Sequence, residues 1–384
     1  SMAVDYNHDL KAADKNIAAS IELEKAAQKD LRPKLSGDAN FQYTGNPLQL
    51  NLDLPSMQNP MTFEGRNMKY GASLSLLQPI YTGGRLLENI RLAKHQQSLA
   101  TYQADYFRSA VCYQTDMQYW NTVARSEIVR ITTEYRNSVA TLSQTIRERV
   151  EAGLVDPQDL LMAEVKLNEA EYQLLQAKRN LETGRMALNS LIGVELHAPT
   201  EIEDTISAVV LDGELWETGG TDRPELKMAY ARIKMAESSK KLTDAKYKPQ
   251  FYSDLDPNYA VYAKLSVPLF EWGKRRDEKR AASLKIGMAT DNLNLVTDQV
   301  KLEVETARVS LSQALEQVRL TESSLGKALE NECMALERYT EGKASVIEVI
   351  EAQTYRQASQ INHVQAKVSA QGSYSELIRA LNRY

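Results

Sequence analysis

Neither glycine nor proline occurs between residues 85 and 152, where the sequence reads RLLENIRLAKHQQSLATYQADYFRSAVCYQTDMQYWNTVARSEIVRITTEYRNSVATLSQTIRERVEA. Apolar residues recur there at steps of three and four, the pattern of a helix that packs along one face. A continuous helix of this length would be roughly 100 Å long. A second stretch, residues 274–341, has no proline and only two isolated glycines. Two such helices predict an elongated antiparallel coiled-coil protein rather than a compact globular one.

Shorter helices are expected beside the two long ones. Asp156 and Pro157 provide an N-cap and a first-position proline, and Ser345 with Glu348 forms a capping box. The predicted short helices are residues 5–31, 157–191, 223–247 and 346–382. In each half, the lengths of the two short helices add up to about the length of one long helix. Each long helix should therefore pack against two short helices placed end to end.

The two halves of the chain repeat each other. Pro79 and Pro268 are 189 residues apart, and so are Gly153 and Gly342. We therefore divide the chain into a first structural repeat, a connecting segment and a second structural repeat, which comprise residues 1–192, 193–221 and 222–384. The connecting segment does not follow the helical pattern and is expected to wrap the middle of the helical part.

Strand patterns lie between the first short helix and the long helix of each half. Apolar residues alternate with polar or small ones in residues 34–44, 67–76 and 259–267. Alternating segments of about ten residues are typical of transmembrane β-strands. A single hairpin with this pattern would more readily be a half-buried hairpin of a soluble protein. Here two such hairpins occur in repeat register, and each leads through a proline into a long helix, which favours transmembrane strands.

The second hairpin is shorter than the first. From Pro33 to Pro79 the chain advances 46 residues, but from Pro249 to Pro268 only 19. Two membrane-length strands need about 20 residues before any loop. We expect residues to be missing near Tyr252 and Ser253, with a true deletion as the alternative.

Composition and motifs exclude several function classes. The net charge is −5 and no long Lys/Arg run occurs, which argues against a nucleic-acid partner. The four histidines are scattered, and there is no P-loop, GxGxxG or Ser/His/Asp set. We therefore expect no enzyme, no cofactor and no metal site. The sequence begins without a basic or apolar leader, so we expect a signal peptide to have been removed.

Several motifs together resemble the TolC-like outer-membrane efflux protein family over essentially the whole chain. They are Leu31-Arg32-Pro33, Gln78-Pro79-Ile80-Tyr81 with Gly83-Gly84, Val267-Pro268-Leu269-Phe270 with Gly273, Ala152-Gly153-Leu154, and Glu341-Gly342-Lys343. Each motif is weak by itself, but their duplicated order is specific.

The resemblance implies a mainly α fold with a transmembrane β part. In a homotrimer each chain would give four strands to a twelve-stranded β-barrel in outer-membrane lipid, and long antiparallel helices would form a coiled-coil α-barrel in the periplasm. The family is an exit duct that meets a periplasmic adaptor and an inner-membrane pump. It exports drugs and other small molecules, or proteins in type I secretion. A soluble coiled-coil scaffold is the alternative from another class.

The turns after the two long helices are the first candidate site. Gly153 and Gly342 have the place of C-cap glycines. The resemblance further implies that both turns form a periplasmic tip that contacts the adaptor. The tip residues are Ala152, Gly153, Leu154, Glu341, Gly342 and Lys343.

Glu348 and Glu351 are the candidate channel constriction. They lie three apart at the start of a helix and so share a face. The plain interpretation is that they are first-turn acids favoured by the helix dipole. The resemblance implies a ring of six carboxylates in the trimer, a cation-selective constriction, with Tyr339 near the gate. Ala344 stands where the family has a gate arginine, which leaves the closing mechanism open.

Aromatic residues flank the predicted strands. Tyr81, Phe270 and Tyr259 are expected to form a membrane-interface girdle, with core packing as the alternative. The resemblance further implies that the duct is wide and that the pump selects the cargo.

Overall fold

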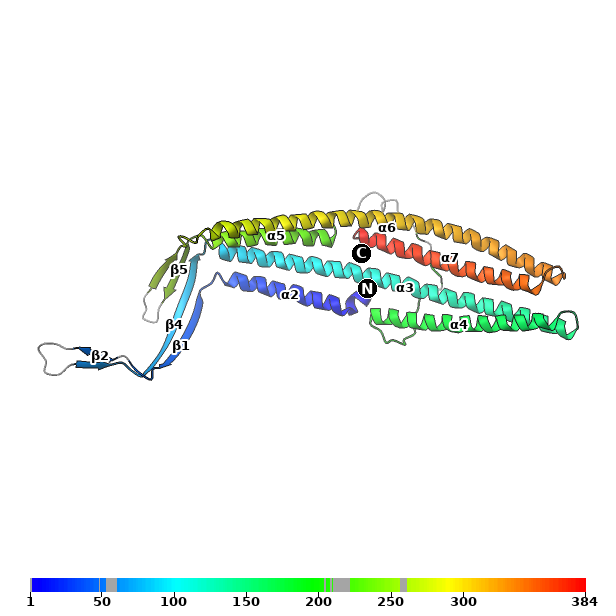
Figure 1. The fold of residues 1–384 in the computed structure, drawn as a ribbon, viewed down its shortest axis with the longest axis horizontal. Coiled ribbons are helices and arrows are strands. Elements are labelled where there is room, and N and C mark those ends of the chain that lie inside the picture. The colour runs from blue at the N-terminus through cyan, green and yellow to red at the C-terminus, as the bar shows by residue number, and fades with distance from the viewer. Residues whose placement is uncertain are drawn as a thin grey trace. The chain divides into compact units, whose positions relative to one another are not determined.

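Two helices of 67 residues each dominate the computed structural model of this protein (Figure 1). They are α3 (Arg85–Glu151) and α6 (Lys274–Thr340), and their bounds agree with the predicted ones to within one residue. Each helix stops where a glycine follows with a positive φ, 72° at Gly153 and 75° at Gly342. Glycine adopts this left-handed conformation without the steric cost of a Cβ.

The structure describes residues 2–47, 49–52, 61–203, 205–207, 209, 222–255 and 261–384. It falls into two units, which we describe separately. Unit 1 comprises Ser1–Asn16, Ala100–Ala229 and Asn292–Tyr384, and unit 2 comprises Ile17–Leu99 and Tyr230–Asp291. The helices α2, α3, α5 and α6 contribute residues to both units.

Three predicted short helices are confirmed, as α4 (Pro157–Ile192), α5 (Pro224–Ala245) and α7 (Val346–Ala380). The prediction of one N-terminal helix was wrong, because α1 (Met2–Tyr6) and α2 (His8–Lys29) are separate. Asn7 lies between them, and its Oδ1 accepts hydrogen bonds from the backbone N–H groups of Asp9 and Leu10 at 2.9 and 3.0 Å. Asparagine thus caps the second helix where the sequence pattern suggested a continuous one.

The main sheet belongs to unit 2 and is antiparallel. Among the described residues it has the strand order β1-β4-β5-β6. The strands are β1 (Lys34–Tyr43), β4 (Met68–Tyr81), β5 (Gln250–Leu255) and β6 (Val261–Ser266). All three strand predictions are confirmed within their described parts, and β4 continues past its predicted end, with an irregularity between Pro79 and Tyr81. A small hairpin of β2 (Gln49–Leu52) and β3 (Met61–Glu64) was not predicted.

The two described strands of the second hairpin are short. β5 runs through Tyr252 and Ser253 without a break, and these residues pair with Lys264 and Ala263 of β6. The two strands have six residues each, against ten in β1 and fourteen in β4.

The register between β1 and β4 separates the side chains into two faces. Leu35 lies opposite Leu76, and Phe41 lies opposite Tyr70. Most residues on the other face are polar, and the hydroxyls of Ser36 and Ser75 are 2.7 Å apart there. Because side chains alternate between faces along a strand, the register produces one apolar and one polar face.

Unit 1 is a helical layer with several small buried clusters. In one cluster Val123 of α3 and Val364 of α7 pack with Ile206, which is 3% exposed. Ile206 belongs to the connecting segment, so the described part of that segment is anchored on the helices. Asn189, fully buried near the end of α4, donates to backbone carbonyls of this segment, among them Ala198 at 3.0 Å.

Candidate functional site

The turns between α3 and α4 and between α6 and α7 have the same backbone construction. In the first, the Gly153 N–H donates to Val150 O and the Leu154 N–H donates to Arg149 O, both at 2.9 Å. In the second, the Gly342 N–H donates to Tyr339 O at 3.0 Å and Lys343 N–H to Arg338 O at 2.8 Å. Both patterns are Schellman motifs, in which the glycine lets the chain leave the helix while the last carbonyls remain bonded.

The two turns are followed by strongly capped helices. The side chain of Asp156 accepts from the backbone N–H of Gln158 at 2.8 Å and starts α4. At the start of α7 the capping box is complete. The Glu348 N–H donates to Ser345 Oγ at 3.3 Å, and the Ser345 N–H donates to Glu348 Oε1 at 3.1 Å. These caps satisfy helix-end donors and hold both turns in place.

One buried cluster joins the two turns. It contains Leu142 and Ile146 of α3, Ala163 of α4, Tyr339 of α6, and Val346 and Val349 of α7. The guanidinium of Arg149 lies over the ring of Tyr339, with 4.7 Å between its carbon and the ring centroid. The first repeat and the second repeat therefore meet at this end of unit 1 through apolar packing and one cation–π contact.

Tyr339 is a core residue of the single chain. It is 5% exposed, and its buried hydroxyl has no hydrogen-bond partner among the described residues. Ala344, at the position of the family's gate arginine, packs against the same cluster. Sequence reasoning missed Arg149, which lies one helical turn before Gly153. Its basic side chain in the last turn of α3 was a visible signal, but its partner was not.

The predicted tip residues Ala152, Gly153, Leu154, Glu341, Gly342 and Lys343 are all exposed. Leu154 is 74% exposed, although leucine is normally buried. Lys343 Nζ and Glu341 Oε2 form an exposed ion pair at 2.8 Å. The surface of the two turns thus offers one apolar side chain and a balanced charge pair to solvent.

Glu348 and Glu351 lie on the exposed side of α7. Hydrogen bonds from the backbone N–H and the hydroxyl of Ser345 hold the pKa of Glu348 below its usual range. Arg338 adds an ion pair with Glu348 at 3.7 Å. Within the described part of the chain, Glu351 makes no hydrogen bond or ion pair. The two acids thus differ, because Glu348 serves the helix start and Glu351 is bound to no other residue that the structure describes.

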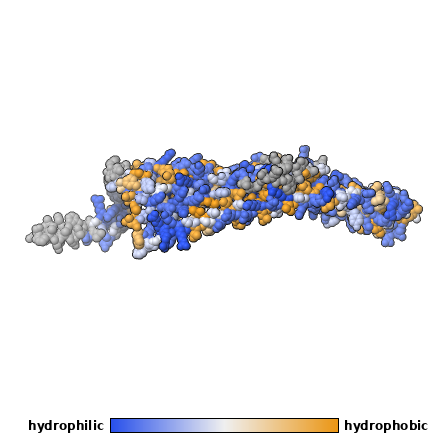
Figure 2. Space-filling model, turned by 90° about the horizontal axis from the view of Figure 1, so that it is seen from above, coloured by the Kyte–Doolittle hydropathy of each residue, from blue (hydrophilic) through white to orange (hydrophobic). Residues whose placement is uncertain are grey.

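The sheet of unit 2 leaves both of its faces uncovered. All ten residues of β1 are exposed, including Leu35 at 72% and Phe41 at 70%. In the described ranges, no strand pairs with the outer edge of β1 or of β6. Orange hydrophobic residues also appear among blue hydrophilic ones on the surface drawn in Figure 2. A sheet with an exposed apolar face and two open edges is incomplete as a water-soluble structure.

The structure describes two of the three aromatic residues that were predicted to form the membrane-interface girdle. Tyr81 and Phe270 are 51% and 72% exposed, and Tyr259 lies outside the described residues. None of the helices in the described ranges combines the length and apolar content that crossing a bilayer requires. Over the same ranges, no group of three His, Cys, Asp or Glu side chains is arranged to hold a metal ion.

Comparison with protein families decides the assignment. The family described as outer membrane efflux protein matches residues 1–194 and 221–383. The chain belongs to the outer membrane efflux protein family. This confirms the resemblance found in the sequence, and with it a mainly helical fold that carries a strand portion.

Solved structures of a bacterial outer membrane channel and of another outer membrane protein have the same fold. The Campylobacter jejuni CmeC outer membrane channel is similar over 99% of this chain and 84% of its own, with a TM-score of 0.80 and 18% identity. The outer membrane protein VceC of Vibrio cholerae is similar over 99% and 94%, with a TM-score of 0.82 and 16% identity.

A curated relative matches a smaller part. The cobalt-zinc-cadmium resistance protein CzcC of Cupriavidus metallidurans is 29% identical over 115 residues. This match spans 30% of the chain and 28% of the relative's own length.

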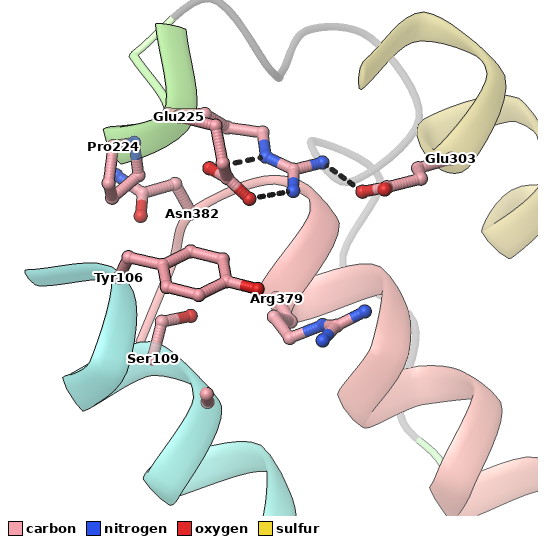
Figure 3. A pocket seen from close by; sticks show the side chains of 9 residues that line it. Tyr106, Ser109, Pro224, Glu225, Glu303, Arg379 and Asn382 are labelled. Atoms are coloured by element: carbon pink, nitrogen blue, oxygen red, sulfur yellow. Dashed lines mark hydrogen bonds and ion pairs between the residues drawn. The ribbon is translucent and has the colours of Figure 1, made fainter. Parts of the chain in front are cut away.

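Unit 1 also contains a small cavity (Figure 3). It has a volume of about 50 Å³ and lies beside Arg223, which is 4% exposed. The Arg223 guanidinium binds Glu225, and its Nη1 donates to Glu303 Oε2 at 2.6 Å. Because both Glu225 and Glu303 bind this arginine, the cluster ties the start of α5 to α6, and the Arg223 guanidinium is not free to bind a ligand.

Proposed function

We propose that three copies of this chain form a passive exit duct of a bacterial tripartite efflux system, which carries small molecules from the periplasm across the outer membrane. The observation that carries this proposal is the sheet β1-β4-β5-β6, with its exposed apolar face and its two open edges. Lipid provides no hydrogen-bond partners for an open edge, so only a closed barrel can cross it. Four strands from each of three copies close a barrel of twelve.

The division of faces supports the same proposal. The apolar face of the β1–β4 pair would contact lipid, and the polar face with Ser36 and Ser75 would line the water-filled interior. Repeats 1–192 and 222–384 would each contribute one hairpin and one long helix, with residues 193–221 as the connecting belt. The helices would then continue the duct into the periplasm.

The exposed turns are proposed as the contact with a periplasmic adaptor, which connects the duct to an inner-membrane pump. Leu154 is the apolar anchor of this surface, and Glu341 and Lys343 are its charged neighbours. A central exposed apolar residue with a polar rim is typical of a protein-binding surface.

Glu348 and Glu351 are proposed as the cation-selective constriction, and the Arg149–Tyr339 contact as the latch that holds the turns together. Glu351 supports the first role because its carboxylate is exposed and unpaired in the described part of the chain. Tyr339 supports the second because it is buried between the repeats. In this proposal Tyr339 sets the position of the constriction without lining it.

Metal cations are a second candidate cargo, favoured by the relative whose name refers to cobalt, zinc and cadmium resistance. The carboxylates of Glu348 and Glu351 would attract such cations. Protein export by type I secretion uses the same duct architecture and is the alternative within the channel class. A soluble scaffold is disfavoured by the uncovered apolar face of the sheet.

Reconstitution in planar lipid bilayers tests the proposed function. The purified protein should produce discrete, ohmic conductance steps after insertion from detergent. A Gly37→Pro variant provides the matched control, because a proline between Ser36 and Asp38 removes a ladder donor from β1 and should abolish the steps. A protein that stays in the aqueous phase without detergent, and produces no steps, would contradict the proposal and favour the scaffold.

A further inference from the structure

The connection between β6 and α6 in unit 2 exposes large apolar side chains. We call residues 267–280 the β6–α6 junction. In it Leu269, Phe270 and Trp272 are 93%, 72% and 90% exposed. The rings of Phe270 and Trp272 stack edge to face with centroids 4.9 Å apart, so they form one aromatic surface.

Trp272 also has an unusual backbone. Its φ is 49°, in the left-handed region that bulky residues avoid. A small or polar residue such as asparagine would adopt this conformation at a lower cost. Folding of the single chain therefore explains neither the choice of tryptophan nor its exposure, and both are explained by contact of the ring with something outside the chain.

Five basic residues follow the aromatic surface directly, at positions 274, 275, 276, 279 and 280. Two of them are neutralised within the unit: Lys279 binds Asp244 at 2.7 Å, and Lys274 approaches Glu278 at 4.0 Å. The arginines are more available. Arg276 is 86% exposed and pairs at 3.5 Å with its exposed neighbour Asp277, and Arg280 has no ion pair in the described ranges.

Arg275 completes the basic surface. Its guanidinium lies 5.7 Å from the ring centroid of Tyr247, a contact that leaves its charge uncompensated. Arg276 and Arg280 are four residues apart on α6 and therefore share a face. The β6–α6 junction thus combines exposed aromatic rings with three guanidinium groups, of which those of Arg275 and Arg280 have no carboxylate partner in the described ranges.

We propose that the β6–α6 junction binds the anionic headgroups of phospholipids at the membrane surface where the strands emerge. Leu269, Phe270 and Trp272 would lie at the level of the headgroups, where aromatic side chains are favoured. Arg275, Arg276 and Arg280 would contact lipid phosphates, which a guanidinium binds with two parallel hydrogen bonds. The inference rests on the proposed function, in which β6 spans the membrane.

The length of the connection between β6 and α6 is compatible with a position in the lipid headgroup layer. Seven residues separate the end of β6 from the start of α6. The headgroup layer of a bilayer is roughly 5–8 Å thick on each side. A connection of this length can place the aromatic rings and the first turn of α6 within that layer.

The first repeat lacks the same surface. Positions 189 residues before Arg275 and Arg276 are Leu86 and Leu87, and the basic residues nearby are engaged. Arg91 pairs with Glu88, and Arg85 Nη2 donates to the hydroxyl of Tyr252 at 3.2 Å. The basic junction is therefore a feature of the second repeat, which predicts one lipid-binding surface per chain.

The test uses the full-length protein purified in mild detergent and measures the phosphatidylglycerol and phosphatidylcholine that it retains by native mass spectrometry. The Arg275→Gln/Arg276→Gln variant should bind phosphatidylglycerol roughly thirtyfold more weakly, at about 1 kcal/mol for each arginine. Its retention of phosphatidylcholine should not change. Lys178→Gln/Arg179→Gln removes the same charge from the exposed side of α4 and serves as the matched control.

The aromatic half is tested separately by Trp272→Asn, which relieves the backbone and removes the ring. This variant should bind both lipids more weakly and to the same degree. Equal loss in the control variant, or no preference for phosphatidylglycerol in the unchanged protein, would overturn the lipid proposal. Dissociation of the oligomer by Arg275→Gln/Arg276→Gln would also overturn it, because the junction would then be a contact between copies.

Oligomer mass and bilayer conductance measured on the same samples separate the two proposals. Normal conductance together with unselective lipid binding refutes only the lipid surface. Absence of conductance and a monomeric mass in the unchanged protein refutes the proposed function, and with it the lipid surface.

Discussion

Replacing Arg149 with methionine should loosen the contact between the two turns of unit 1. Methionine keeps the apolar stem of the side chain but removes the charge that lies over the Tyr339 ring at 4.7 Å. A partly buried cation–π contact contributes about 0.5–2 kcal/mol. The population in which the turns separate should therefore rise roughly 2- to 30-fold.

The change is measured in two ways. Hydrogen exchange of the backbone amides in residues 339–349 reports separation of the turns directly, and planar-bilayer recording reports how often the duct opens. Both the exchange rate and the open probability should increase in Arg149→Met.

Arg147→Met is the matched control on the same helix. Arg147 binds Glu164 of α4 at 2.7 Å, an exposed pair that lies within the first repeat and does not reach Tyr339. Loss of an exposed ion pair costs about 0–1 kcal/mol and should not separate the turns. Equal effects of the two arginine variants would refute the latch.

Removing the hydroxyl of Tyr339 should have the opposite effect on hydrogen exchange from removing the charge of Arg149. Its hydroxyl is buried without a partner in the described structure, which costs about 1–3 kcal/mol. Tyr339→Phe should therefore leave exchange unchanged or slow it, whereas Tyr339→Ala should unlock the turns at a cost of about 3–5 kcal/mol. Faster opening in Tyr339→Phe would show that the hydroxyl is bonded in the assembled protein and would contradict the account.

Three further predictions concern charge and thiol chemistry. Glu348→Gln/Glu351→Gln should lower cation selectivity and block by multivalent cations while costing less than about 1 kcal/mol, because glutamine preserves the capping box; unaltered selectivity in single-channel recording would place the constriction elsewhere. Burial holds the pKa of His363 below its ordinary 6.5, and nearby Lys367 lowers it further, so the neutral ring is favoured in the fold. The contribution of His363 to the free energy of unfolding should be constant above pH 6.5 and should be lost as the pH falls through the lower pKa of the folded state. In a series of thermal-unfolding measurements at different pH, His363→Gln should reduce this loss. An identical loss in the variant would show that other groups cause it. Burial also raises the pKa of the Cys112 thiol, whereas Cys333 is exposed, so maleimide should label Cys333 first in the folded protein and both at similar rates in denaturant.

The long helices could be predicted from the sequence because their limits are set by local chemistry. No proline interrupts either long helix, and α6 continues through its two isolated glycines. Gly153 and Gly342 mark the ends because they adopt a positive φ. The strands were predicted for the same reason, since alternation along β1 and β4 is a local pattern. The capping box at Ser345 was predicted residue by residue.

The rest depends on contacts that no local pattern contains. Asn7 breaks a strongly helical segment because its side chain competes with the backbone for two N–H groups. Tyr339 was expected near the gate, but its burial follows from the meeting of two helix pairs that are far apart in sequence. The partner of Arg149 and the lack of a partner for Glu351 among the described residues are likewise visible only once the turns are packed together.

The most direct test of the central claim is the number of chains in the detergent-solubilised protein. Native mass spectrometry of the full chain should give a protein mass of about 130 kDa, three times the 43.2 kDa of one chain. Three copies of the sheet close its edges and complete the duct, so no stable monomer should remain in mild detergent. A stable monomer of 43.2 kDa, or a hexamer, would contradict the account.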